Sequence, residues 1–471
     1  MENFLLKHAG KKPVSFHMPG HKGSSLYKRF GHESFLKDFL DYDVTEIEGA
    51  DNLFQREGII ADLAEKYRRL YGVQASIPLI NGTSCGLIAA ILAAVPRGGK
   101  LILARNCHKS VFNALTLGGI QPVYARPVLS SSWGISGEVA PEEIERLLTE
   151  HPDASAVILP SPNYYGICSD ISQIGEVVHR FGKILIVDQA HGAHLEFFHR
   201  FGETEGSDAE KIGNSGLPLN GERAGADIVV NSIHKTLGSM TQSALLNLCS
   251  ERVDQELLEE WLQMLESTSP SYILMTSLDI NARILEAHGP LLFQEWQENL
   301  DWFYTQAREI SGLRIMEAPG LDRTKLNLDM SDRGYNGRAL EEALIEGYHI
   351  YPELNTGNIL MAMTGIGNTR EDYSRLLEAL RELAEREKEP SSPKASSDSR
   401  NPGLEGRFAG LMAQEGKTCL RSVIPYPPGI PLICPGEVVR RTQLEELTDC
   451  LRNGEKVLGL TKEGLIKVKE G

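Results

Sequence analysis

The sequence has no pair of cysteines spaced as Cys-x-x-Cys, no internal repeat and no long apolar run. Its seven cysteines are scattered through 471 residues, which argues against a disulfide framework or a zinc ribbon and predicts a reduced protein. No segment approaches the roughly 18 apolar residues that a membrane span needs, and residues 1–10 contain no apolar signal-peptide core. We therefore expect a cytoplasmic protein that does not cross a membrane.

An excess of positive charge is also missing. The net charge of the chain is −16 at pH 7, which argues against nucleic acid as a partner because nucleic-acid-binding proteins present basic surfaces. Hydrophobic residues make up 41% and charged residues 24% of the sequence, as in ordinary globular proteins. A chain of this length predicts two or three domains.

Short apolar segments and helical segments alternate through the first half of the chain. The apolar segments have the length and the flanking turn residues of buried strands, and they cover residues 77–80, 101–103, 123–124, 156–159, 184–187 and 228–230. Helical periodicity covers residues 59–71, 86–95, 141–150 and 175–181. This alternation predicts an α/β fold with a mostly parallel sheet covered by helices, in which ligands bind at the carboxyl ends of the strands.

The later part of the chain is organised differently. It combines three predicted strands with long helices over 291–310 and 370–387, which indicates a smaller α+β domain. A stretch without large apolar residues then predicts a flexible linker, and the prolines of residues 423–437 exclude a helix or a central strand there. The predicted parts are an N-terminal segment, a large domain, a small domain, the linker and a C-terminal domain, at residues 1–50, 51–300, 301–387, 388–403 and 404–471, respectively.

Two of the predicted strands end in side chains that suit one cofactor. The strand over 184–187 runs into Asp188, and the strand over 228–230 is followed by Lys235. A lysine at the end of a buried strand is costly unless chemistry uses its amine, although a surface lysine after a strand has the same pattern. An acid and a lysine on consecutive strands suit pyridoxal phosphate (PLP), because a lysine binds the aldehyde as a Schiff base and an acid binds the pyridine nitrogen.

Another predicted strand is followed by hydroxyl groups at the start of a helix. Thr83 and Ser84 precede the helix over 86–95, where free backbone N–H groups and the helix dipole favour an anion such as a phosphate. A simple helix cap uses the same residue types, and the turn does not match the glycine patterns of nucleotide-binding loops. The side chains expected at this edge of the sheet are Thr83, His108, Asn163, Asp188 and Lys235.

In their order along the chain, these motifs resemble those of the bacterial ornithine/lysine/arginine decarboxylases. That family consists of PLP enzymes with the aspartate aminotransferase-like fold (fold type I), and the likeness is to its short, Gram-positive-type members. The motifs that carry the resemblance are His17-Met-Pro-Gly-His-Lys22, Asn81-Gly-Thr-Ser84, Arg105-Asn-Cys-His-Lys-Ser110, Asp188-Gln-Ala-His191, Ser232-Ile-His-Lys235, Ser267-Thr-Ser-Pro-Ser-Tyr272 and Pro425-Tyr-Pro-Pro-Gly-Ile-Pro431. The resemblance implies a fold type I large domain, a smaller α+β domain and a C-terminal decarboxylase-type domain.

The resemblance also implies an activity. Members of the family remove the α-carboxylate of arginine, lysine or ornithine as CO2 and leave agmatine, cadaverine or putrescine. Arginine is favoured by the resemblance, followed by lysine. Because the active sites of the family lie at a dimer interface, we expect a homodimer or a higher homo-oligomer. Glu437 is a candidate to meet the cationic end of the substrate, although an acid at that position also suits a helix N-terminus.

Residue roles follow from the positions that match the family motifs. Lys235 would bind the cofactor aldehyde, Asp188 would pair with the pyridinium nitrogen, and His108 would stack on the ring. These three are the predicted catalytic residues, and either His108 or Lys235 would return a proton to the α-carbon. The other predicted cofactor contacts are Thr83, Ser84, His191, Ser232 and His234, together with Thr268 and Ser269, which would reach the cofactor of a neighbouring subunit. No metal site is expected.

Parts of the sequence are compatible with other functions. Asp188, His191 and His194 have metal-ligand residue types at three-residue spacing, and His17 and His21 would complete the site of a metal-dependent hydrolase. Residues three apart on a strand face opposite sides, however. An aminotransferase would need an arginine for the substrate carboxylate, and the candidates are Arg323, Arg333, Arg338 and Arg370. A catalytically silent binding protein would usually have lost the lysine that is present here.

Overall fold

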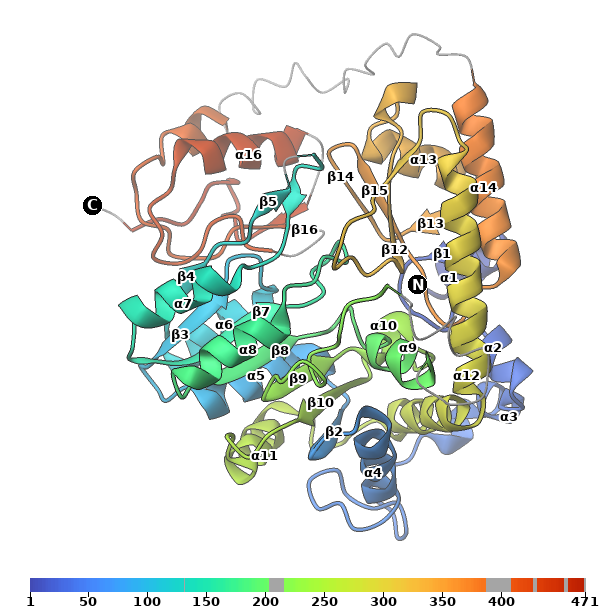
Figure 1. Ribbon diagram of the computed structural model, residues 1–471, viewed down its shortest axis with the longest axis horizontal. Helices are drawn as coiled ribbons and strands as arrows, with labels where there is room; N and C mark the ends of the chain where they lie inside the picture. Colours follow the sequence, from blue (N-terminus) through green and yellow to red (C-terminus); the bar gives the residue numbers. More distant parts are fainter. Residues whose placement is uncertain (131, 203–215, 387–407, 427–429, 453–455, 470–471) are drawn as a thin grey trace. The chain divides into compact units, whose positions relative to one another are not determined.

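The computed structural model describes residues 1–130, 132–202, 216–386, 408–426, 430–452 and 456–469. The predicted linker over 388–403 therefore lies outside the described residues. The chain forms two compact units (Figure 1). The first joins Met1–Arg105 to Asn113–Arg386, and the second joins Asn106–Phe112 to Glu387–Gly471. The five-part division proposed from the sequence stays a prediction.

A seven-stranded sheet forms the centre of the first unit. Its strand order is β2-β10-β9-β8-β7-β3-β4. The pairs of β10 with β2 and β9 are antiparallel, and the other pairs are parallel. The strands are β2 (Ala75–Leu79), β3 (Lys100–Ala104), β4 (Gln121–Ala125), β7 (Ala154–Pro160), β8 (Ile184–Asp188), β9 (Ile228–Asn231) and β10 (Ala244–Leu248). The predicted mostly parallel sheet is confirmed.

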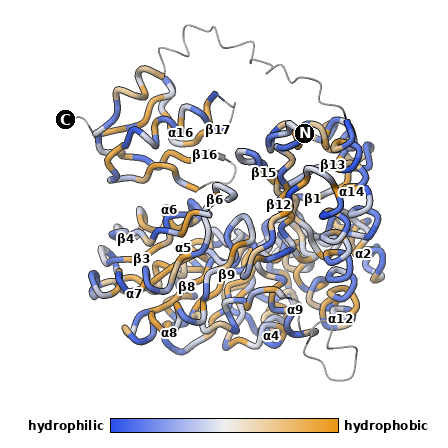
Figure 2. The backbone as a smooth tube through the Cα atoms, turned by 45° about the horizontal axis from the view of Figure 1, so that its top comes forward, coloured by the Kyte–Doolittle hydropathy of each residue, from blue (hydrophilic) through white to orange (hydrophobic). Residues whose placement is uncertain are grey.

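The central strands are hydrophobic over most of their length (Figure 2), as expected where both faces of a sheet are buried. Helix α5 packs against β9 and β10, while α7 packs on β4 and α8 on β8. At Gly86 a side chain on α5 would lie 2.6 Å from Leu79 Cδ1, so glycine allows the helix to approach the sheet closely. The helices of this part are α4 (Ile59–Tyr71), α5 (Gly82–Ala94), α6 (Lys109–Gly118), α7 (Pro141–Glu150), α8 (Ile171–Arg180), α9 (Leu195–Gly202), α10 (Ile233–Thr236) and α11 (Gln255–Leu265). Between β4 and α7, β5 (Leu129–Ser130) pairs with β6 (Ile135–Ser136).

A smaller, antiparallel sheet with the order β11-β12-β15-β14 follows in the chain. Its strands are β11 (Arg314–Ile315), β12 (Lys325–Asp329), β14 (Leu354–Thr356) and β15 (Ile359–Met363). The accompanying helices are α12 (Tyr272–Arg308), η2 (Ser331–Arg333), α13 (Gly337–Tyr348) and α14 (Arg370–Glu385). The strands and helices of this region match the α+β character expected from the sequence.

The long helix predicted over residues 291–310 starts much earlier, at Tyr272. Ser271 caps it by accepting a hydrogen bond from the Leu274 N–H. Pro290 lies inside the helix and removes a backbone hydrogen bond, yet the buried side chains on both sides of it, including Leu285 and Phe293, keep the helix continuous. Among the described residues, no helix combines the length and the apolar composition needed to cross a membrane.

The N-terminal segment contacts other parts of the first unit around residues 14–20, and its first helix buries no residue. Its elements are α1 (Glu2–Gly10), β1 (Val14–Phe16), α2 (Ser25–Arg29), α3 (Glu33–Lys37) and η1 (Phe39–Tyr42), and β1 pairs in parallel with β13 (Ile350–Pro352). The Gly20 N–H donates to the His234 carbonyl at 2.7 Å, and the Gly20 carbonyl accepts the Gly367 N–H at 3.0 Å. A side chain at position 20 would lie 2.5 Å from the Leu237 carbonyl oxygen, so only glycine fits here without displacement of the backbone.

The second unit contains β16 (Ile424–Tyr426), β17 (Lys456–Leu458) and α16 (Arg441–Arg452). The two strands form an antiparallel pair, so Pro425, the first proline of the 423–437 stretch, lies in a two-stranded sheet and in no central strand. Its hydrophobic core comprises Leu411, Cys419, Val423, Ile433, Val439, Leu444, Leu447 and Ile466.

Candidate active site

The carboxyl ends of β8 and β9 bring an acid and a lysine to one edge of the large sheet. β8 ends at Asp188, which lies opposite Val230 of β9. The short helix α10 follows β9, begins after Ser232 and contains Lys235. The sequence predicts this arrangement because both strands are uninterrupted apolar runs that end in polar residues.

Lys235 is half-buried, and its Nζ lies 2.9 Å from Nε2 of His191. Burial lowers the pKa of Lys235 from its ordinary value, while the nearby carboxylates of Asp188 and Glu353 oppose this shift. A lower pKa increases the neutral fraction of the amine near pH 7, and the neutral amine is the form that attacks an aldehyde. Lys235 is therefore suited to covalent attachment of a carbonyl compound.

Asp188 is only 5% exposed. Its Oδ1 accepts a hydrogen bond from the Ala190 N–H at 3.2 Å. Burial raises the pKa of Asp188, and the positive charge of Lys235 acts in the opposite direction. A buried carboxylate is stabilised by a positively charged N–H donor, and the protonated nitrogen of a pyridine ring is such a donor. On this point the residues fit PLP.

Hydroxyl groups that follow β2 and β9 meet at the edge of the sheet where Lys235 lies. Thr83 Oγ1, in the first turn of α5, lies 3.2 Å from Ser232 Oγ, and Ser84 is exposed on the same turn. His234 Nδ1 lies 3.0 Å from the Ser243 carbonyl, and burial lowers the pKa of His234 to about 4. Two hydroxyl groups at the N-terminus of a 13-residue helix fit a phosphate group.

A chain of contacts leads from His191 to a carboxylate that the sequence analysis missed. The rings of Tyr164 and His191 have centroids 4.6 Å apart. The Tyr164 hydroxyl donates to Glu353 Oε1 at 2.9 Å, and Glu353 Oε2 accepts the Met18 N–H at 2.9 Å. Tyr164 follows a predicted strand in a turn, which is a weak signal. Glu353 comes after β13 with no motif around it, so only the fold reveals its place.

Three of the predicted site residues are not brought to Lys235 by the described contacts. His108 belongs to the second unit, where its Nδ1 lies 2.9 Å from Ser110 Oγ. Thr268 and Ser269 are exposed in the loop between α11 and α12. The predicted roles of these residues, in the same subunit or across a dimer, stay predictions.

The metal-site alternative is not supported. Within the described ranges, no three or more His, Cys, Asp or Glu side chains are grouped so that they could hold a metal ion. His191 faces Lys235, whereas His194 contacts Thr236 and Asp322. His17 faces the carbonyl of Met18.

The arginines considered for an aminotransferase contact other parts of the first unit. These contacts join Arg323 to Asp301, Arg333 to Ser311, Arg338 to Glu342 and Arg370 to the Glu298 carbonyl. All four partners lie on α12, on α13 or just after α12. None of these four contacts involves β8, β9 or α10.

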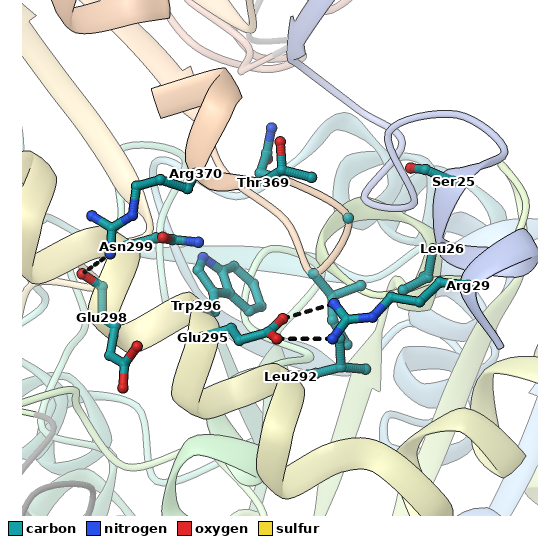
Figure 3. Close-up of a pocket in the computed structure, with 13 residues that line it drawn as sticks. Ser25, Leu26, Arg29, Leu292, Glu295, Trp296, Glu298, Asn299, Thr369 and Arg370 are labelled. Atoms are coloured by element: carbon teal, nitrogen blue, oxygen red, sulfur yellow. Dashed lines mark hydrogen bonds and ion pairs between the residues drawn. The ribbon is translucent and has the colours of Figure 1, made fainter. Parts of the chain in front are cut away.

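A separate pocket of about 390 Å³ lies where α2, α12 and the start of α14 meet (Figure 3). Arg29 and Glu295 form a two-bond ion pair at its edge, with both N–O distances at 2.8 Å. Asn299 and Trp296 of α12 also line it. None of the predicted site residues belongs to its lining, so we do not assign it to the cofactor.

Comparison with known families gives two matches. Residues 1–310 match the family model described as "Orn/Lys/Arg decarboxylase, major domain". Residues 397–459 match the model described as "Orn/Lys/Arg decarboxylase, C-terminal domain". Together the two matches cover most of the chain, in the order expected from the motifs.

Individual proteins give the same result. The chain is 30% identical to an arginine decarboxylase of Bacillus subtilis and to one of Halalkalibacterium halodurans, in each case over 97% of this chain and 94% of the relative. The match to the structure of the constitutive lysine decarboxylase of Escherichia coli covers 100% of this chain and 81% of that protein's chain, with a TM-score of 0.71 and 19% identity. An alanine–glyoxylate aminotransferase from Nostoc covers 79% of this chain and 95% of its own, with a TM-score of 0.57 and 16% identity. These structural likenesses confirm the predicted fold.

Proposed function

The chain belongs to the Orn/Lys/Arg decarboxylase family, and on that premise we propose that its substrate is arginine, which it converts to agmatine and CO2. It is a PLP-dependent decarboxylase of a basic amino acid. The choice of arginine rests on one observation: almost the whole chain is similar to Bacillus proteins named arginine decarboxylase. Lysine and ornithine are the alternatives.

We propose that Lys235 binds the cofactor through its amine and that Asp188 pairs with the pyridine nitrogen. Thr83, Ser232 and His234 are proposed to hold the phosphate. When bound, PLP accepts the electron pair of the bond that joins the α-carbon to the departing carboxylate. Asp188 keeps a proton on the pyridine nitrogen, because a buried, charge-assisted hydrogen bond favours the charged form of its partner.

Two side chains beside the cofactor position are suited to proton transfer. Lys235 Nζ and His191 Nε2 lie 2.9 Å apart, within the range in which a proton passes between hydrogen-bonded groups. We propose that Lys235 delivers a proton to the α-carbon and that His191 exchanges protons with it. We propose that His108 stacks on the cofactor ring. Its alternative role is donation of the proton to the α-carbon.

We also propose that Glu353 binds the positively charged end of the substrate, in preference to Glu437. The Glu353 carboxylate is half-buried and close enough to Lys235 to influence its pKa. Tyr164 and the Met18 N–H hold it in place. Glu437 lies in the second unit, where its Oε2 accepts the Cys434 N–H at 2.8 Å, so it helps to close a turn.

Glu353→Gln is expected to raise the KM for arginine about 10- to 100-fold and to change kcat less. A hydrogen bond to a charged group contributes about 1.5–3 kcal/mol, and glutamine keeps the shape and one acceptor oxygen while losing the charge. Steady-state CO2 release over a range of arginine concentrations measures both constants. Glu341→Gln is the matched control, because Glu341 is a half-buried carboxylate that bonds to Asn355 on the small sheet. An unchanged KM in Glu353→Gln would contradict the assignment.

CO2 release from PLP-loaded protein, offered arginine, lysine and ornithine in separate reactions, tests the substrate proposal. We expect release from arginine with agmatine as the amine product. Release from lysine alone, with cadaverine as the product, would show that the substrate is lysine and that the reaction is still decarboxylation. Formation of a keto acid without CO2 would instead indicate transamination.

The oligomeric state and the location in the cell are proposed from the family resemblance and the composition. We propose a homodimer in which Thr268 and Ser269 reach the cofactor of the partner subunit. Their exposure in the single chain supports this proposal, because residues that serve a neighbouring subunit must lie on the surface of their own. A cytoplasmic location stays a prediction.

A further inference from the structure

Three ionisable side chains behind the active site are completely inaccessible to solvent. Lys325, Asp322 and His194 each have an exposed fraction of 0%. Lys325 Nζ lies 2.5 Å from Asp322 Oδ2, and His194 Nε2 lies 3.1 Å from the same oxygen. Burial alone would raise the pKa of Asp322, but the neighbouring imidazole and ammonium groups hold it well below its usual range. The group is therefore a buried, compensated ion pair with an imidazole attached.

The ammonium group of Lys325 is fully occupied. Besides Asp322, it contacts the His191 carbonyl at 2.5 Å and Thr324 Oγ1 at 3.2 Å. A lysine has three N–H donors, so each of them has a partner. Such a geometry fixes the three partners relative to one another, and one of these is the backbone of the residue that contacts Lys235.

Two short routes join this group to the cofactor lysine. In the first, Lys325 holds the His191 backbone, and the His191 ring lies 2.9 Å from Lys235 Nζ. In the second, His194 Nδ1 lies 3.1 Å from the hydroxyl of Thr236, the residue after Lys235. The routes connect Lys325, the first residue of β12, and Asp322 just before it with α10 and with the turn between β8 and α9 (Figure 1).

Stability alone does not account for this arrangement. Replacing a buried ion pair by apolar residues of similar volume is often neutral or stabilising, because desolvation of the charges offsets their attraction. A hydrophobic pair at these two positions would therefore be expected to hold the two regions together about as well. What it would lack is the directional hydrogen bond to the His191 carbonyl.

We propose that Lys325 and Asp322 are positioning residues for Lys235. Lys325 holds the turn that carries His191. Asp322 compensates the charge of Lys325 and orients His194. Through His191 and His194, the two residues fix the position of the Lys235 amine. The inference rests on the proposed role of Lys235 as the cofactor lysine. It adds Lys325 of β12 and Asp322, which precedes that strand, to the residues that position the cofactor lysine.

The decisive variant is the double replacement Lys325→Met with Asp322→Leu, which removes the ion pair without leaving an uncompensated charge. We expect kcat to fall at least about tenfold, since misplacement of a reacting group by an ångström can cost 10²-fold. We expect KM for arginine to change less than about threefold, because Glu353 is untouched. The thermal unfolding midpoint is expected to stay near that of the wild type or to fall modestly, because the apolar replacement offsets part of the cost of leaving the His191 carbonyl and the Thr324 N–H without partners.

A second measurement does not depend on the cofactor. Competitive acetylation of the cofactor-free protein, followed by mass spectrometry, gives the reactivity of Lys235 as a function of pH. We expect the titration midpoint of Lys235 to shift in the double variant. The control is Lys66→Met with Asp279→Leu, which removes another ion pair with a 2.5 Å separation, between α4 and α12, and should leave the titration unchanged.

The outcomes separate the two proposals. A double variant with wild-type kcat and a wild-type Lys235 titration would overturn the positioning role. If the wild type releases no CO2 from any basic amino acid, the proposed function is contradicted. An altered Lys235 titration in the double variant would then still support the positioning role.

Discussion

Lys235→Ala is expected to lower kcat for CO2 release by at least about 10³-fold, because no other amine takes over the covalent attachment of the cofactor. Borohydride treatment of the PLP-loaded protein, followed by peptide mass spectrometry, should place the reduced cofactor on Lys235 in the wild type and leave it absent from the variant. This readout is independent of turnover. It also distinguishes a lost attachment site from a misfolded protein, because folding can be followed separately by circular dichroism.

Lys28→Ala is a suitable control for the first experiment. Lys28 is exposed on α2 and has no part in the proposed site, so labelling and turnover should remain at wild-type levels. Substantial CO2 release by Lys235→Ala, or cofactor attached to a different lysine in the wild type, would show that the wrong lysine has been assigned.

Asp188→Ala is expected to reduce kcat about 10²- to 10³-fold, whereas Asp188→Glu should cost only about tenfold. Removing one partner of a buried charge pair costs about 3–5 kcal/mol, and about 1.4 kcal/mol corresponds to a factor of ten in rate. Glutamate keeps the charge but moves it by one methylene group. CO2 release by the three PLP-loaded proteins measures the effect. Equal losses in both variants would argue that the acid does not meet the cofactor.

The raised pKa of Asp188 also predicts a dependence of stability on pH. Because folding raises this pKa in the cofactor-free protein, the folded chain holds the proton more tightly than the unfolded chain. The contribution of Asp188 to stability is therefore present below the ordinary carboxyl pKa and falls as the pH rises through the raised value. Asp188→Asn, which does not titrate, should lose less stability than the wild type between acidic and neutral pH. Chemical denaturation of both cofactor-free proteins at several pH values tests this expectation.

The sequence alone was sufficient for the elements that carry Asp188 and Lys235. Both follow strands whose residues are all apolar, and a buried parallel strand has that composition because helices cover both of its faces. The place of Thr83 at the start of a helix could be predicted for a similar reason, since its strand, turn and helix are continuous in the chain. The fold class follows from the same alternation, and the antiparallel β10 between β2 and β9 is a departure that local patterns do not reveal.

Glu353 and Lys325 could not be found in this way. Glu353 meets Tyr164 from 189 positions away in the sequence, and Lys325 meets the carbonyl of His191 from 134 positions away. Neither residue lies in a motif: Lys325 is on β12 of the small sheet, and Glu353 lies between β13 and β14. Contacts of this kind are set by how two sheets pack, which depends on tertiary structure and not on the periodicity of any one segment.

The buried pair of Lys325 and Asp322 has a consequence for how the first unit folds. The pair lies at the start of β12, its partners His191 and His194 lie in the turn after β8, and His194 links it to Thr236 of α10. A state in which the small sheet has formed without the large one would leave an ammonium group without its full set of hydrogen bonds, which is costly wherever water cannot replace them. Partly folded states are disfavoured for that reason. The two sheets are therefore expected to gain and lose their structure together, as one cooperative unit.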